Sequence, residues 1–246
     1  MNKGLLAGVI VVIVIAAAGF GTYAYLTAPT KGPSSGQQGQ MMPPQGGPGG
    51  NRQPPAPLAE ASAPTADSVT PAPGQTLYTI VSASSTATFT LDEQLRGEPK
   101  TVVGTSTGMV AGEIGYDKAH PASSTIGTIK LNARTFVTDD NSRNNMIRRA
   151  ILKTEDDANE FITFAPSTTA STGDNAFDVT GDLTIAGTTK TTVFHVTTTE
   201  QADGSLSIHG TTTVKRADFN LSIPNIPFIA NVTDDVKLDL NLVAAK

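Results

Sequence analysis

The stretch FDVTGDLTIAGTTK, residues 177–190, alternates apolar and polar side chains. The apolar ones stand at odd positions, namely Phe177, Val179, Leu183 and Ile185. A two-residue period is typical of a β-strand with one buried and one solvated face, and Gly181 in its middle indicates a bend or a close approach to the backbone. Gly187 marks a turn before a second alternating run, 193–199. The stretch therefore predicts an antiparallel hairpin with a connection, 186–192, somewhat longer than a tight turn.

Strand-like alternation extends through most of the chain after residue 76. Threonine is dense there, and its branched side chain packs well on a pleated surface. Further strands are expected at 78–80, 87–91, 125–137, 161–165, 206–214 and 236–243, with a pair of glycine-bent strands within 101–117. The total is about eight antiparallel strands. A sheet of this size avoids exposed edges by closing into a barrel, whose interior is either filled by side chains or holds one small ligand.

The β-rich part contains one convincing helix. Residues 139–142 supply aspartate, asparagine and serine, which cap helix N-termini. The apolar residues Met146, Ile147, Ala150 and Ile151 then recur at helical spacing and form a single stripe. We therefore predict one substantial helix over 141–153, covering an end or flank of the barrel.

The amino terminus predicts export. Residues 4–28 carry no charge and follow Lys3. As a helix they would extend about 37 Å, enough to cross a hydrocarbon core of roughly 30 Å, with the positive end in the cytoplasm. We expect residues 1–28 to be a single-pass membrane anchor, with the rest extracytoplasmic in the periplasm or at the cell surface. The alternative is a signal peptide cleaved near Ala16 to Ala18, which would give a secreted protein.

A linker follows the anchor. Between residues 29 and 75 the composition is dominated by proline, glycine, glutamine, serine and alanine, with few residues able to form a core. Such a segment is expected to be a disordered tether. The predicted organisation is therefore an anchor at 1–28, a linker at 29–75 and a β-barrel domain at 76–246.

Composition excludes several classes of function. A net charge of −5 argues against a nucleic-acid partner, because phosphate binding needs a concentrated basic surface. The absence of cysteine excludes disulfides, thiolate catalysis and cysteine-ligated zinc. His120, His195 and His209 lack the close spacing of metal ligands, and no phosphate loop or nucleophile elbow is present. We predict no catalytic residue, no metal and no cofactor.

The hairpin motif also resembles a known family. Gly-Asp-Leu-Thr-Ile-x-Gly-x-Thr-Lys, residues 181–190, is similar to the signature of the YceI-like family. The resemblance extends over residues 77–246 and is carried further by Val103-Gly104, Gly112-Glu113-Ile114, Tyr116-Asp117, Asp139-Asp140 with Arg143, Ile162-Thr163-Phe164 and Arg216-Ala217-Asp218-Phe219. The chain departs from the pattern at Asn144, where an acidic residue is usual, and at Asn220, where glycine is usual. The resemblance implies an exported, lipocalin-like β-barrel that holds long apolar lipids such as polyisoprenoids.

The functional question is what occupies the interior. The side chains expected to line it as ligand-binding residues are Phe89, Ile129, Leu131, Phe164, Phe177, Val179, Leu183, Ile185, Phe194, Val196, Ile208, Leu238 and Leu240. Arg143, Arg148 and Arg149 could hold a lipid headgroup, since arginine binds phosphate bidentately, although a solvated helix face balanced by Glu155, Asp156 and Asp157 is the favoured interpretation. We expect non-catalytic binding of a polyisoprenoid or other long-chain lipid. The alternatives are a filled barrel that acts as an interaction module and, less favoured, a lipid hydrolase.

Overall fold

The computed structural model describes residues 59–224 and 229–246. The anchor predicted at 1–28 and the linker as far as residue 58 lie outside these residues. Within the described ranges, no helix combines the length and the apolar character needed to cross a membrane.

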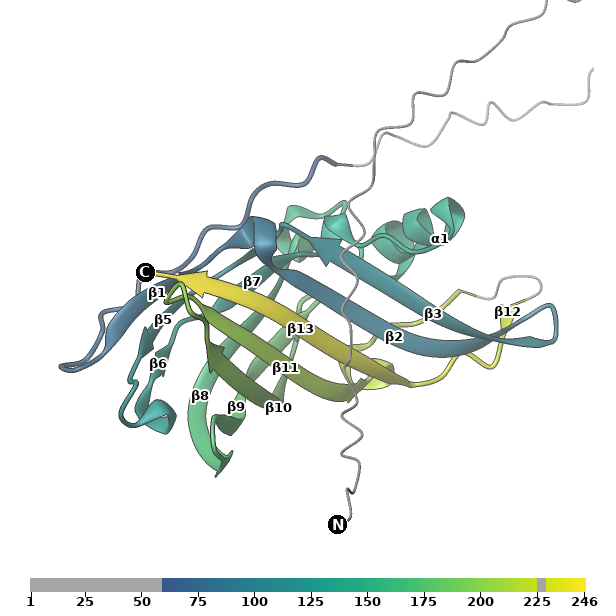
Figure 1. Ribbon diagram of the computed structural model, residues 1–246. Coiled ribbons are helices and arrows are strands. Elements are labelled where there is room, and N and C mark those ends of the chain that lie inside the picture. Colours follow the sequence, from purple (N-terminus) through teal and green to yellow (C-terminus); the bar gives the residue numbers. More distant parts are fainter. Residues whose placement is uncertain (1–58, 225–228) are drawn as a thin grey trace, which may run out of the picture. The chain divides into compact units, whose positions relative to one another are not determined.

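The described residues form one antiparallel sheet of 13 strands with one α-helix beside it (Figure 1). The strands are β1 (Thr76–Ile80), β2 (Thr86–Leu95), β3 (Glu98–Thr107), β4 (Val110–Ala111), β5 (Glu113–Tyr116), β6 (Thr125–Ile126), β7 (Ile129–Asn132), β8 (Phe161–Gly173), β9 (Ala176–Ile185), β10 (Thr188–Glu200), β11 (Leu206–Lys215), β12 (Ile229–Ala230) and β13 (Asp235–Ala245). Short 3-10 turns lie at Ser82–Ser84, Pro121–Ser123, Ala133–Thr135, Asp157–Asn159 and Arg216–Phe219.

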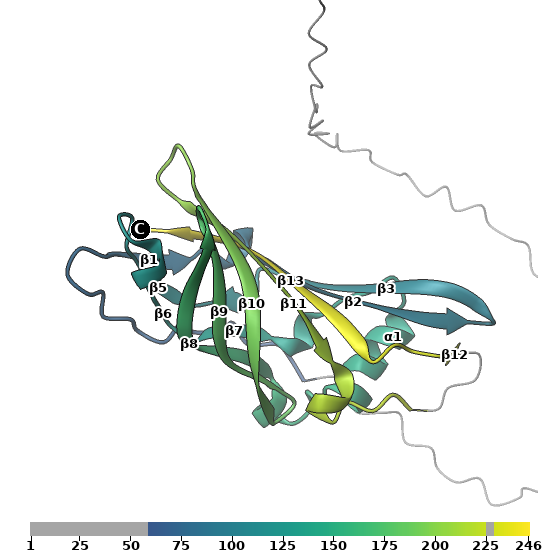
Figure 2. The ribbon, with the colours of Figure 1, turned by 90° about the horizontal axis from the view of Figure 1, so that it is seen from below.

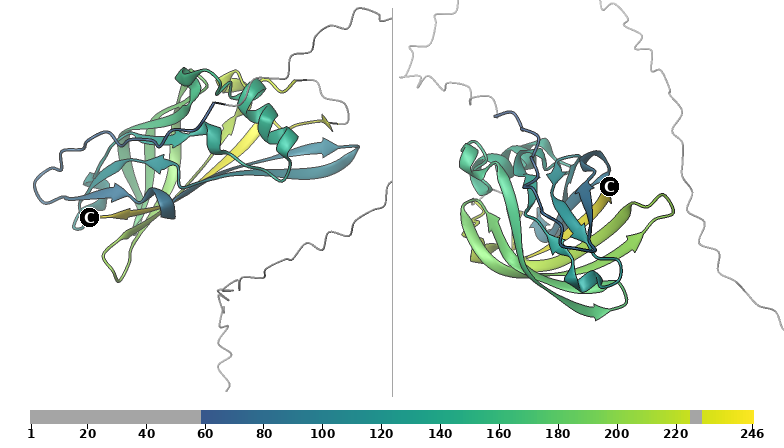
Figure 3. Two further views of the ribbon diagram at one scale, coloured as in Figure 1. Left: turned by 90° about the horizontal axis from the view of Figure 1, so that it is seen from above. Right: turned by 90° about the vertical axis from the view of Figure 1, so that its left-hand side faces the viewer.

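The sheet curls strongly. Its strand order is β4-β7-β8-β9-β10-β11-β13-β1-β5-β6, while β2 pairs with β13, β3 and β12. Strands β8, β9, β10, β11 and β13 form one continuous wall, which Figure 2 shows from below and Figure 3 shows end-on. The segment that contains β4 and β5 pairs with β7 through Val110 and with β1 through Ile114. The sheet therefore bends round to surround an apolar interior, as the all-β prediction requires.

The hairpin of β9 and β10 confirms the alternation of residues 177–190. All four apolar side chains of β9 are at most 6% exposed. The connection is shorter than predicted, because Ile185 pairs with Thr188 and leaves a two-residue turn. Ala186 and Gly187 both have positive φ, of 47° and 75°. This left-handed pair matches the twist of the flanking strands.

Bends in the chain explain why the predicted number of about eight strands is too low. Gly108 has a φ of 74°, and Gly112 separates β4 from β5. The glycine-bent region therefore contains three strands rather than two. The strand predicted over 125–137 is also interrupted, and it ends at Asn132, where a 3-10 turn begins. The side chain of Asn132 caps this turn by accepting a hydrogen bond from the Arg134 amide.

The predicted helix begins where expected but is not uniform. Helix α1 (Asn141–Met146) is capped by Asp140, whose side chain accepts a hydrogen bond from the Arg143 amide. The chain then continues as a π-turn over Ile147–Ile151. The prediction of one regular helix to residue 153 is therefore wrong in its second half. The apolar stripe still faces the sheet, and Ile147 is 8% exposed.

Residues 59–75, here called the docked segment, lie along the sheet before β1. The amide and hydroxyl of Ser62 both donate to Glu160 Oε1, at 2.6 Å. Asn132 Nδ2 donates to the Ser62 carbonyl at 2.6 Å, and Arg134 Nη1 lies 3.0 Å from Glu160 Oε2. Burial alone would raise the pKa of Glu160, yet the hydrogen bonds from Ser62 and Asn132 and the charge of Arg134 lower it. Residues that the sequence assigned to the linker thus contribute hydrogen bonds to a buried polar cluster.

Candidate functional site

The interior contains a large apolar cavity at the end of the sheet next to α1. Its volume is about 360 Å³. The walls come from β2, β3, β8, β9, β11, β12 and β13, together with α1, the π-turn and residues of the segment that follows β11. The polar residues on its lining are Glu93, Arg96, Asp140, Ser142, Arg143 and Arg216, and the others are apolar. A mostly apolar cavity with a few converging polar groups is the usual form of a small-molecule site.

Arginine side chains form part of the lining of the large cavity. Arg143 Nη2 lies 2.9 Å from Glu93 Oε1, and both side chains are largely buried. Arg143 also pairs with Asp139. The hydrogen bond from Lys100 and the charge of Arg143 hold the pKa of Asp139 below its ordinary value. This network keeps the guanidinium of Arg143 fixed beside the cavity.

Arg216 reaches the same cavity from the turn after β11. Its Nη1 donates to the Leu221 carbonyl at 2.7 Å, and its Nη2 is 4.0 Å from Asp234. The Nε atom is buried and has no hydrogen-bond partner among the described residues. An unpartnered buried donor is costly, so a polar group of a ligand would be stabilised there.

A second, smaller cavity of about 90 Å³ lies further along the same interior. Its walls come mainly from β8, β9, β10, β11 and β13. The rings of Phe164 and Phe194 meet there edge to face, with centroids 4.8 Å apart. Gly181 makes room for this pair, because a Cβ at that position would lie 2.8 Å from Phe164 Cζ. The aromatic pair therefore forms part of a wall that is otherwise mostly aliphatic.

A family model for the YceI-like domain matches residues 78–244. The chain belongs to the YceI-like family. The match spans β1 to the end of β13, so the family domain coincides with the sheet. The comparison with curated protein sequences finds no match.

Several solved structures resemble this YceI-like domain, and two of them show the extent of the likeness. One is BcnA from Burkholderia cenocepacia, with a TM-score of 0.56 and 22% identity, covering 68% of this chain and 99% of that chain. The other is described as a polyisoprenoid binding domain from Saccharophagus degradans implicated in plant cell wall breakdown, with a TM-score of 0.51 and 14% identity, covering 68% and 97%. At these identities the comparisons establish a shared fold.

The structure divides the residues predicted to bind a ligand into three groups. Phe89, Ile185 and Leu238 line the large cavity. Ile129, Phe164, Phe177, Val179, Phe194, Val196, Ile208 and Leu240 line the small one. Leu131 and Leu183 are buried and line neither cavity. The predicted residues all face the interior, but they do not line one common cavity.

The predicted headgroup arginines are also separated. Arg143 lines the large cavity, whereas Arg148 donates to the Phe136 carbonyl at 3.1 Å and Arg149 pairs with Glu155. Sequence reasoning missed Glu93 and Arg216. The sequence could have indicated Glu93, because it stands at the same alternate positions of β2 as the inward-facing Phe89. In the structure Glu93 is 7% exposed. Arg216 belongs to the Arg216-Ala217-Asp218-Phe219 motif of the resemblance, but it lies in a turn, where no alternation indicates that its side chain reaches the interior.

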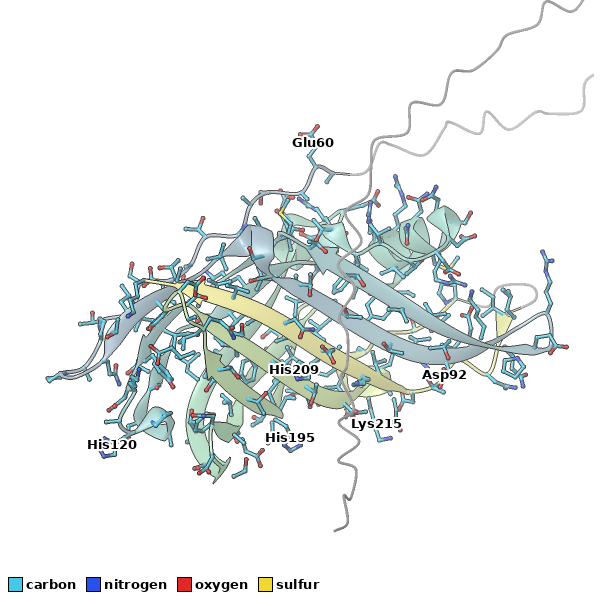
Figure 4. The ribbon with its side chains drawn as sticks, in the orientation of Figure 1. Glu60, Asp92, His120, His195, His209 and Lys215 are labelled. Atoms are coloured by element: carbon cyan, nitrogen blue, oxygen red, sulfur yellow. The ribbon has the colours of Figure 1, made fainter. Side chains whose placement is uncertain are left out.

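The three histidines lie on the outside of the YceI-like domain. His195 and His209 project from the outer face of the wall (Figure 4). His195 Nδ1 is 2.6 Å from Asp178, and His209 Nε2 is 3.2 Å from Asp239. Within residues 59–224 and 229–246, no cluster of three or more ligating side chains could hold a metal. The interior cavities are therefore the candidate site.

Proposed function

We propose that the YceI-like domain binds an amphiphilic lipid or isoprenoid in the large cavity and carries or sequesters it in the cell envelope, without a covalent step. The observation that carries the proposal is the cavity of about 360 Å³, with mostly apolar walls and arginine side chains on its lining. A filled interior would instead have favoured an interaction module.

Apolar burial supplies the affinity. Each buried methylene contributes about 0.8 kcal/mol, so ten of them would contribute about 8 kcal/mol. Association costs roughly 4–15 kcal/mol in lost freedom of motion. If the association cost lies in the lower part of its range, burial of the tail exceeds it by a few kcal/mol. The resulting binding is reversible, which suits a carrier. No group on the cavity wall needs to react with the ligand.

The arginine side chains on the lining of the large cavity would hold the headgroup. Arg143 is fixed by Glu93 and Asp139, and the unpartnered Nε of Arg216 offers a further donor. Charge-assisted hydrogen bonds from arginine favour phosphate or carboxylate groups. The Nε of Arg148 is also buried without a partner among the described residues, but neither Arg148 nor Arg149 lines the large cavity. We therefore assign the headgroup role to Arg143 and Arg216, which do.

The setting of this function is part of the proposal. The uncharged stretch at residues 4–28 supports a single-pass anchor in the cytoplasmic membrane, with the YceI-like domain in the periplasm or at the cell surface. The polyisoprenoid binding domain from Saccharophagus degradans supports an isoprenoid as one class of ligand. A tethered carrier near a membrane would exchange lipid with it directly.

Native mass spectrometry of the full chain tests the proposal. The protein purified from bacteria should carry a hydrophobic adduct. Val214→Trp should remove that adduct, because Val214 lines the large cavity and the indole would fill part of it. Val103→Trp is the matched control, since Val103 is 46% exposed on β3 and the same change leaves the cavity intact. A bare mass for the wild-type chain, with no uptake of added polyprenols or fatty acids, would favour the interaction module instead.

A further inference from the structure

The two cavities are separated by a layer of side chains. On β9, Val179 lines the small cavity and Ile185 lines the large one, while Leu183 between them lines neither. On β11, Thr212 lies between the two linings in the same way. Leu183 and Thr212 are 3% and 9% exposed. On β9 and β11 the wall therefore changes from one cavity to the other across a buried side chain. On β8 and β13 the two linings adjoin, at Ile162 and Phe164 and at Leu238 and Leu240.

Other strands contribute to the same layer. Leu131 on β7 pairs in register with Ile162, which lines the large cavity, and is itself 7% exposed. Ala87 on β2 is 2% exposed, and Val110 on β4 is fully buried. None of these three lines either cavity. We call Ala87, Val110, Leu131, Leu183 and Thr212 the floor.

The volume above the floor limits the length of a bound chain. An apolar cavity of about 150 Å³ accommodates one benzene ring, or six carbons. By this measure the large cavity, of about 360 Å³, accommodates roughly 14 carbons. The small cavity, of about 90 Å³, would add roughly four more if the floor were open. A polyisoprenoid of many units does not fit above the floor.

We infer that the ligand is a single-chain amphiphile of about 14 carbons, whose tail ends on the floor. The inference rests on the proposed binding function and narrows its ligand class. Leu183 and Leu131 are buried and belong to neither lining, so we assign to them the role of setting the accepted chain length. Below this limit, each added methylene should tighten binding about fourfold, which corresponds to about 0.8 kcal/mol. Beyond the limit, binding should weaken, because the additional carbons no longer fit above the floor.

Photo-crosslinking to the full chain in phosphatidylcholine nanodiscs tests the limit directly. The probes are n-alkanoic acids of 8 to 20 carbons with a diazirine on the last carbon, and labelled peptides are mapped by mass spectrometry. Chains near 14 carbons should label Leu131, Leu183 or their neighbours. Chains of 18 to 20 carbons should label the protein at least tenfold less, and not at Leu206 or Ile208, which line the small cavity.

Leu183→Ala should open the floor and move the preferred length upward by about four carbons, with new labelling at Ile208. Leu206→Ala is the matched control, because it removes the same atoms from a buried leucine of the small cavity and leaves the floor intact. Its length profile should equal that of the wild type. Leu131→Ala opens the floor from another strand and serves if Leu183→Ala does not fold.

The outcomes separate this inference from the function on which it rests. Labelling of the interior by short and long probes alike, reaching Ile208 in the wild type, would overturn the floor while leaving lipid binding intact. No labelling of the interior at any length would overturn both. Labelling that stops at Leu131 and Leu183 and moves to Ile208 only in the floor variants supports the inference.

Discussion

Gly181 is the residue at which the packing of the interior depends most directly on a missing side chain. A Cβ there would lie 2.5 Å from the Ala165 carbonyl oxygen and 2.8 Å from Pro166 Cα. These are backbone atoms, which cannot move aside as a flexible side chain would. Gly181→Ala should therefore destabilise the protein by about 1–3 kcal/mol, the usual range for overpacking. Denaturant unfolding measures the change.

Gly210 provides the comparison on β11. A methyl group at this position would meet its nearest neighbour, Val196 Cγ2, at 3.6 Å, which is ordinary van der Waals contact. Gly210→Ala should be neutral or stabilising by up to about 1 kcal/mol, since glycine loses more conformational entropy on folding. If both variants lose the same free energy of unfolding, the close contacts around Gly181 are not the reason why glycine is needed there.

At the scale of elements, the turn between β9 and β10 carries strain that can be relieved. Ala186 has a φ of 47°, a left-handed conformation that costs a residue with a Cβ roughly 1–2 kcal/mol. Ala186→Gly should raise the free energy of unfolding by up to about 1 kcal/mol, because glycine avoids that cost but loses more entropy on folding. Ala165→Gly, on an exposed part of β8 without positive φ, should lower it by about 0.5–1 kcal/mol. Thermal unfolding of both variants checks the sign, and a loss at residue 186 would contradict the argument.

The same hairpin shows what sequence predicts about elements and what it does not. Alternation identified the buried face of β9, because the period of a strand fixes which side chains share a face. The length of the turn was missed because the usual signal for two positive φ values is asparagine or aspartate followed by glycine, and Ala186 stands in the first position. Likewise, the π-turn after α1 leaves the helical spacing of apolar residues almost unchanged.

At the scale of the whole molecule, the sequence predicted which side chains face inward but not how the interior is divided. The odd or even position of Leu183 in its strand predicts which face of the sheet it lies on. Its level within the interior relative to Leu131 depends on strand tilt and register. The floor therefore emerges only when strands far apart in sequence are brought together. Arg216 was missed for a related reason, since its position depends on the turn that follows β11.

The docked segment extends the folding unit beyond the strands. Its composition of proline, serine and alanine gave no periodic signal. Nevertheless, Ser62 donates a hydrogen bond to the carboxylate of Glu160, which is only 7% exposed. A chain beginning at residue 76 would leave Glu160 and Asn132 with fewer partners. Each buried polar group left without a partner costs about 1–3 kcal/mol. We expect this chain to be less stable than one beginning at residue 59 by about 2–4 kcal/mol, from two such groups partly rescued by water.

The pH dependence distinguishes this explanation from a general loss of packing. Because the folded pKa of Glu160 lies below its ordinary value of 4.5, its contribution to stability is present above that pH and is lost as the pH falls through the folded pKa. The stability difference between the two chains should be constant above pH 4.5 and should shrink below it, as measured by urea unfolding across pH. When Glu160→Gln is made in both chains, the stability difference between them should no longer change with pH. A difference between the chains that stays the same at every pH would mean that the segment stabilises the domain by apolar contact rather than through Glu160.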